Sequence, residues 1–105
     1  MAADDTTPIA CSLDAEALRG RADEWRALVA SHVTSVESGP ESVRLVLDGS
    51  DDALLAAASL GAREKECCPF FDVAVELEPA RRILRFSVPA GAEPVLREFV
   101  SLLRP

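Results

Sequence analysis

The sequence predicts an α+β fold of two layers, a four-stranded antiparallel sheet of two hairpins with helices on one face. In three stretches the apolar residues recur at three- and four-residue spacing, which is typical of amphipathic helices. Between these stretches lie pairs of alternating segments joined by short turns. Short turns indicate hairpins rather than parallel crossovers. The predicted order is therefore helix, hairpin, helix, hairpin, helix, and two layers are the simplest way to bury the apolar faces.

The length and composition predict one folded domain. The chain has 105 residues, of which 49% are apolar and 28% are charged, and this is near the usual size of a single domain. Residues 1–8 are small, polar and acidic, so a flexible tail is expected there. Residues 9–105 are expected to form the single α+β domain.

The first helix is predicted in two pieces. Gly20 is a poor helix former, so we expect a turn over residues 14–18 before a main helix over 20–32. One face of this helix is apolar, with Trp25 as its anchor. His32 stands near the end of the helix, where its charge would be favourable against the helix dipole.

The first hairpin begins where the apolar spacing changes from helical to alternating. Two extended segments, 33–37 and 42–48, flank the turn dipeptide Gly39-Pro40. In the second segment the alternation places most valines and leucines toward the core. Val46 is the exception and is expected on the solvent side.

The second helix is predicted over residues 51–67. Ser50 can cap it, and the acidic residues at 51 and 52 suit the positive end of the helix dipole. Alanines on one face allow a close approach to the sheet. Residues 63–65, Arg-Glu-Lys, are expected to form a solvated end.

The second hairpin contains the clearest strand in the chain. In residues 71–78 the larger apolar residues alternate with Asp72, Ala74, Glu76 and Glu78, and the apolar positions are expected to face the core. A turn at Pro79 leads into a strand over 84–88, which Pro89 ends. A last helix is predicted over 91–103, and its buried face comprises Val95, Leu96, Phe99, Val100 and Leu103.

The charge of the chain excludes some partners. The net charge is −7 and the isoelectric point is about 4.6, so neither nucleic acid nor an anionic membrane is an expected partner. No apolar run reaches the roughly 18 residues that a membrane span needs. A small soluble protein of the cytoplasm is therefore expected, where thiols are kept reduced.

The cysteines are the main chemical signal. Cys67 and Cys68 stand where the second helix is predicted to end, and Pro69 forces the backbone to change direction there. Thiolates prefer soft metals and metalloids, and three sulfurs would meet if Cys11 packs against this corner. We therefore predict a soft metal or metalloid site at Cys11, Cys67 and Cys68, in a sensor, carrier or scavenger. A closed zinc site is not expected, because the chain has no Cys-x-x-Cys motif and one histidine.

Two other interpretations stay open. One is a non-catalytic interaction module, a homodimer through the sheet face or edge, in which the cysteines are structural. Phe70, expected on the sheet face opposite Phe71, would line an apolar pocket or a dimer contact, or would be a partly covered residue at the edge. The other is a thiol redox enzyme. A helix C-terminus and nearby carboxylates raise the pKa of a thiol, which indicates an inert thiol more than an activated nucleophile.

No catalytic residue is predicted. Glu66 and Asp72 are carboxyls close to the thiols, but the polar side of an alternating strand explains Asp72 without catalysis. The chain also has no nucleophile-elbow motif and no glycine-rich phosphate loop.

The segment from Arg63 to Phe71, which contains Glu-Cys-Cys-Pro-Phe after an alanine-rich helix, resembles small uncharacterised bacterial proteins. A weaker similarity extends over residues 11–28. Some of those proteins are associated with metal- or metalloid-responsive regulators. The resemblance implies a metal or metalloid ligand for this chain, and it implies no catalytic residues.

Overall fold

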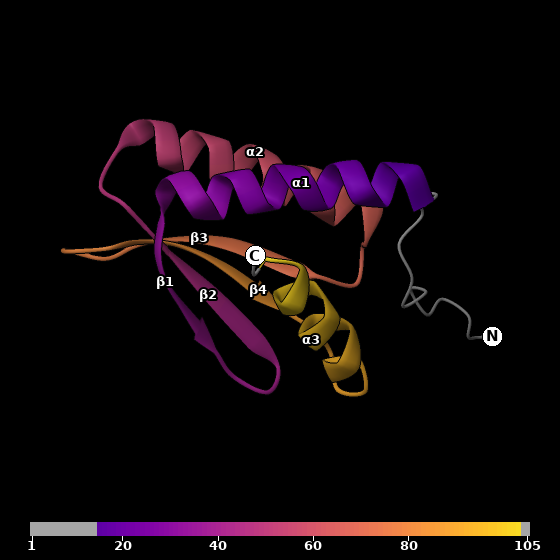
Figure 1. The fold of residues 1–105 in the computed structure, drawn as a ribbon. Helices are drawn as coiled ribbons and strands as arrows, with labels where there is room; N and C mark the ends of the chain where they lie inside the picture. The colour runs from indigo at the N-terminus through magenta and orange to yellow at the C-terminus, as the bar shows by residue number, and fades with distance from the viewer. Residues whose placement is uncertain (1–14, 104–105) are drawn as a thin grey trace.

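The computed structural model describes residues 15–103, and the predicted tail over residues 1–8 and Cys11 lie outside this part of the chain. The helices are α1 (Ala15–His32), α2 (Asp51–Cys67) and α3 (Glu93–Leu102), and the strands are β1 (Val33–Ser38), β2 (Ser42–Leu47), β3 (Asp72–Leu77) and β4 (Arg82–Ser87). The predicted α+β fold and its element order are confirmed (Figure 1). Among the described helices, none has the length and apolar character that a membrane span needs.

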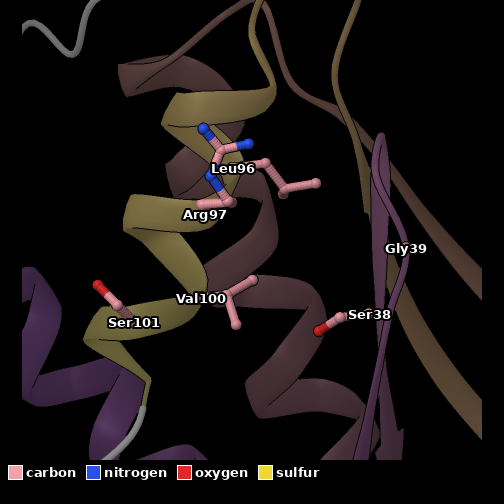
Figure 2. A pocket seen from close by; sticks show the side chains of 6 residues that line it. All are labelled: Ser38, Gly39, Leu96, Arg97, Val100 and Ser101. Carbon is pink, nitrogen blue, oxygen red and sulfur yellow. The ribbon is translucent and has the colours of Figure 1, made fainter.

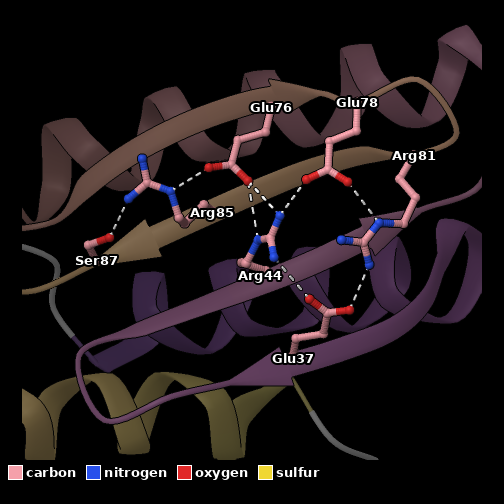
Figure 3. A network of polar contacts seen from close by, with 7 residues as sticks. All are labelled: Glu37, Arg44, Glu76, Glu78, Arg81, Arg85 and Ser87. Carbon is pink, nitrogen blue, oxygen red and sulfur yellow. Dashed lines mark hydrogen bonds and ion pairs between the residues drawn. The ribbon is translucent and has the colours of Figure 1, made fainter.

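The four strands form one antiparallel sheet in the order β1-β2-β4-β3. Each hairpin supplies one central and one edge strand, and the hairpins join where β2 pairs with β4, from Ser42 opposite Ser87 to Leu47 opposite Arg82. The helices pack on one face of the sheet, and a single core contains buried residues of all three. No helix of residues 15–103 lies on the other face (Figure 3).

The core centres on a cluster of aromatic rings. Trp25 of α1 meets Phe86 of β4 and Phe99 of α3 edge to face, with ring centroids 5.3 and 5.4 Å apart. Phe71 lies 5.5 Å from Phe86 and 5.4 Å from Phe99. Each such pair contributes about 0.5–1.5 kcal/mol beyond the burial of its area. The predicted role of Trp25 as the anchor of its helix is confirmed, since it is almost fully buried.

Helix α1 is continuous, so the predicted break at Gly20 is wrong. Gly20 is exposed, and a Cβ atom placed there would meet no atom of the described residues within 4 Å. A glycine in a helix costs about 1 kcal/mol relative to alanine. The packing of Trp25 and Leu28 in the core outweighs this local cost.

Two expectations about strand burial are also wrong. Val46 is buried rather than exposed, because it lies in a central strand directly opposite Ile83, which is buried as well. Val75 and Leu77 were expected in the core, but Leu77 is 70% exposed and Val75 is also exposed. They belong to edge strand β3. Alternation identifies the face on which a side chain lies, but not whether a helix covers that part of the face.

Phe70 does not lie on the sheet face opposite Phe71. It belongs to the turn before β3, which begins at Asp72, so strand alternation does not apply to it. Its ring is buried and lies 4.8 Å from the ring of Phe71. Both phenylalanines therefore contribute to the same core.

The helix-free face of the sheet carries a network of ion pairs that crosses all four strands (Figure 3). Arg44 of β2 contacts Glu37 of β1 at 3.3 Å and Glu76 of β3 at 3.1 Å. Arg85 of β4 contacts Glu76 at 2.8 Å. Glu78 and Arg81, beside the β3–β4 turn, complete this sheet-face network.

Candidate metal or metalloid site

The corner after α2 is held by backbone hydrogen bonds. Cys68 is the C-cap residue of α2, and its N–H donates to the carbonyl of Glu64 at 2.7 Å. The ammonium of Lys65 donates to the carbonyls of Pro69 and Phe71, both at 2.7 Å. The backbone thus leaves the helix at Cys68, as the sequence predicted from Pro69, and the following turn is tied back to α2.

This corner brings two sulfurs and one carboxylate together. The Sγ atoms of Cys67 and Cys68 are 3.6 Å apart, and Cys68 Sγ lies 3.6 Å from Oε2 of Glu64. The three ligand atoms all lie within 4.8 Å of one another. All three side chains are buried. Among the described side chains, this Glu64–Cys67–Cys68 cluster is the one grouping of this kind.

Glu64 was not predicted as part of the site, because it was expected at the solvated end of α2. It is 6% exposed, and its Oε1 accepts a hydrogen bond from Trp25 Nε1 at 2.8 Å. The guanidinium of Arg21 lies 3.5 Å from the same oxygen. A buried carboxylate needs such partners. The signal in the sequence was its spacing, since Glu64 and Cys68 are four residues apart and therefore share one face of the helix.

The electrostatics of the cluster keep Cys68 protonated. Burial raises the pKa of its thiol to about 12, and the charge and hydrogen bond of Glu64 act in the same direction. The charge of Arg21 opposes this in part. The expectation of an inert thiol is met for Cys68, because a protonated thiol is a poor nucleophile.

Cys67 and Cys68 differ in their state, and the expectation that the thiols are reduced is wrong for Cys67. Cys68 is a free thiol, whereas Cys67 is disulfide-bonded. The predicted approach of Cys11 to this corner concerns a residue outside the described part of the chain, so it stays a prediction. Cys67 becomes a ligand for a metal or metalloid only when its disulfide is reduced, because the thiolate is the ligand.

A cavity of about 530 Å³ adjoins the cluster, between α1, the corner after α2, and α3. Its walls are mainly apolar and come from Ala22, Phe71, Val95, Phe99 and Leu102. Cys68 and Glu64 also line it. The volume is in the range of small-molecule sites, which are apolar with a few polar groups.

The other candidate residues lie apart from the cluster. Glu66 and Asp72 are exposed and are not members of it. His32 lies at the end of α1, as predicted, and its Nδ1 is 2.8 Å from Oδ2 of Asp48. These residues therefore offer no further ligand at the corner.

A second cavity lies between α3 and the turn of the first hairpin (Figure 2). It measures about 330 Å³, and Leu96 and Val100 project into it opposite Ser38. Among its described lining residues, Arg97 is the charged one. The described residues of its lining include neither a thiol nor a carboxylate, which are the ligand groups found at the Glu64–Cys67–Cys68 cluster.

Comparison with protein-family models, curated proteins and solved structures finds no match to this chain.

Proposed function

We propose that this protein binds a soft metal or metalloid ion through Cys67 and Cys68, with Glu64 beside them, and acts as a sensor, carrier or scavenger. The observation that carries the proposal is the pair of sulfurs 3.6 Å apart on a fixed corner. Cys11, which the sequence predicted as a ligand, is the proposed third sulfur.

The sulfur separation supports a bent coordination. Two metal–sulfur bonds of about 2.3 Å whose ends are 3.6 Å apart meet at an angle of about 100°. That angle suits a tetrahedral ion or a pyramidal trivalent metalloid. A linear arrangement would need the sulfurs about 4.6 Å apart, and the corner would then have to open.

The redox state controls this binding. The disulfide of Cys67 competes with an ion for the same sulfur, so the reduced protein is the binding form. Oxidation would release the ion.

Native mass spectrometry of the reduced protein tests the proposal with arsenite, Hg²⁺ and Zn²⁺. We expect one ion per chain, lost in Cys67→Ser and in Cys68→Ser, and weakened in Cys11→Ser. Glu64→Gln should change the affinity for the ion. Glu66→Gln is the matched control and should leave this affinity unchanged, because Glu66 is an exposed neighbour on the same helix. Binding that survives both Cys67→Ser and Cys68→Ser would overturn the proposal.

A homodimeric interaction module is the second candidate, and the exposed edge favours it. β3 is an edge strand on which Val75 and Leu77 are both exposed, and apolar edges are prone to pair. If this edge forms a dimer, Leu77→Lys should shift the sedimentation coefficient to that of a monomer. A monomeric wild-type chain at high micromolar concentration would count against it.

A further inference from the structure

We propose that the preferred ligand is a trivalent arsenical with an aromatic substituent, its arsenic bonded to both sulfurs and its ring in the adjoining cavity. This inference rests on the proposed function, because it assigns the arsenic to the same two cysteines. It adds a role for the cavity, which metal binding alone leaves without one.

The first support is the bent sulfur geometry. Trivalent arsenic is pyramidal, so two sulfurs 3.6 Å apart can occupy two of its three positions without opening the corner. The third position of an organic arsenical is a carbon. The cavity beside Cys68 is the place into which that substituent can extend.

The second support is the shape and polarity of the cavity. Its volume of about 530 Å³ exceeds what a bare ion needs. Phe71 and Phe99 are buried aromatic walls, and Val95 and Leu102 add apolar surface from α3. Aromatic rings pack favourably against such walls.

The third support is the distribution of charge around the cavity. Asp23, Arg26 and Glu98 line it with exposed side chains, so these groups can stay in water when a ring enters. Glu64 is already hydrogen-bonded to Trp25. A neutral ring therefore enters without desolvating an unpaired charge. Such desolvation would cost free energy.

The chemistry is an exchange without oxidation or reduction of arsenic. Phenylarsonous acid carries two hydroxyls on arsenic, and each reacts with one thiol. Two As–S bonds form while two As–O and two S–H bonds break, and the hydroxyls leave as two molecules of water with the thiol protons. The disulfide of Cys67 must first be reduced, for which a phosphine supplies the two electrons and is then removed.

The test compares phenylarsonous acid with methylarsonous acid on the reduced chain, each in competition with dithiothreitol. The competing dithiol cancels the intrinsic As–S bond strength, so the difference reports the substituent. We expect the ratio of phenyl to methyl binding constants to be at least about tenfold larger for the protein than for dithiothreitol, because the protein removes the ring from water. Cys11→Ser should retain this binding, since carbon occupies the third arsenic position.

Leu102→Glu tests the cavity directly. Leu102 is 37% exposed on α3, so the change places a charge on the wall at little cost to folding. We expect the phenyl-to-methyl binding ratio of this variant to fall toward the ratio shown by dithiothreitol. Leu55→Glu is the matched control, because Leu55 is 67% exposed on α2 and does not line the cavity.

The two proposals fail in different ways. If both arsenicals bind through Cys67 and Cys68 without a phenyl preference, the cavity inference is overturned and the proposed function stands. If neither arsenical binds the reduced chain, the inference is overturned, and the proposed function stands only if arsenite, Hg²⁺ or Zn²⁺ still binds through Cys67 and Cys68. A phenyl preference that persists in folded Leu102→Glu, verified by circular dichroism, would place the ring elsewhere and also overturn the inference.

Discussion

Glu64 sets the chemistry of the neighbouring thiol. Its carboxylate accepts a hydrogen bond from Trp25 Nε1 and lies near the guanidinium of Arg21, so a negative charge is held in a buried position. Oε2 of the same carboxylate lies beside Cys68 Sγ. Burial and this charge together raise the pKa of the Cys68 thiol.

Cys68 should therefore be nearly inert to alkylation at neutral pH. With a thiol pKa of about 12, its thiolate fraction at pH 8 is lower by about three orders of magnitude than that of a thiol with a pKa of about 8.5. Iodoacetamide labelling of Cys68, followed by peptide mass spectrometry across pH, measures this. Modification of native Cys68 at the rate of a thiol with a pKa of about 8.5 would contradict this prediction.

Glu64→Gln should lower the pKa of Cys68 and move its labelling profile toward neutral pH, because the repelling charge is removed. Glu66→Gln should leave the profile in place. The raised pKa also has a consequence for stability. It favours the folded state at pH values below the unfolded thiol pKa, and this contribution is lost as the pH rises toward 12.

Helix α2 positions the site because it lies close against the sheet. At Gly61, a Cβ atom would lie 3.0 Å from Val73 Cγ1 and 3.4 Å from Leu84 Cδ1. The glycine therefore allows the helix to approach strands β3 and β4. One turn later the same helix carries Glu64, and then Cys67 and Cys68 at its end.

The two helical glycines should respond differently to alanine. Gly20→Ala, on α1 with open space around it, should raise the free energy of unfolding by up to about 1 kcal/mol through helix propensity. Gly61→Ala should give a smaller gain or a loss, because Val73 must shift. Urea denaturation of both variants measures the difference. A gain at Gly61 equal to that at Gly20 would show that the helix-to-sheet spacing is relaxed.

The start of α2 should show a pH dependence at Asp48. Ser50 donates to Asp48 Oδ1 at 2.6 Å through its hydroxyl, which also accepts from the N–H of Ala53 at 3.1 Å. Hydrogen bonds from Ser50, and then from His32, lower the pKa of Asp48 to about 2. Because the folded pKa is lowered, the stabilisation is present above the unfolded value and is lost as the pH falls through about 2.

Ser50→Ala should raise the pKa of Asp48 in an NMR titration and lower the free energy of unfolding by about 1 kcal/mol through loss of the helix cap. Ser59→Ala, an exposed position of the same helix, is the control. Ser59→Ala should neither raise the pKa of Asp48 nor lower the free energy of unfolding. An unchanged Asp48 titration in Ser50→Ala would exclude the hydroxyl as the cause.

The two sheet faces differ across the whole molecule. One face carries the helices, the core and the proposed site, while the other carries the sheet-face network (Figure 3). Hydrogen bonds from arginines lower the pKa values of Glu76 and Glu78. Their stabilising contribution is therefore present at neutral pH and is lost as the pH falls through the lowered values.

Arg44→Met should lower the urea midpoint at neutral pH and low salt, because Glu37, Glu76 and Glu78 lose a shared cation. Salt screens exposed charges, so the difference should shrink as ionic strength rises. Arg97→Met, an exposed position on α3, should have little effect. A salt-independent loss in Arg44→Met would indicate lost packing rather than lost charge.

The order of elements was predictable because each depends on short-range patterns. The serine at position 50 and the proline at position 69 bracket α2, which the sequence predicted with the observed bounds. The corner at Cys68 was predictable for the same reason, since proline restricts the residue before it. The local charge around the thiol also indicated the direction of its pKa.

Tertiary packing decided the rest. Whether Glu64 is buried depends on Trp25 and Arg21, which are about forty residues away in the chain. Whether Leu77 is covered depends on how far the helices extend along β3, and whether α1 continues through Gly20 depends on the core contacts of Trp25. The sequence by itself thus determined the elements and the paired thiols, through local backbone chemistry. The buried carboxylate and the cavity beside them exist only because distant segments pack together.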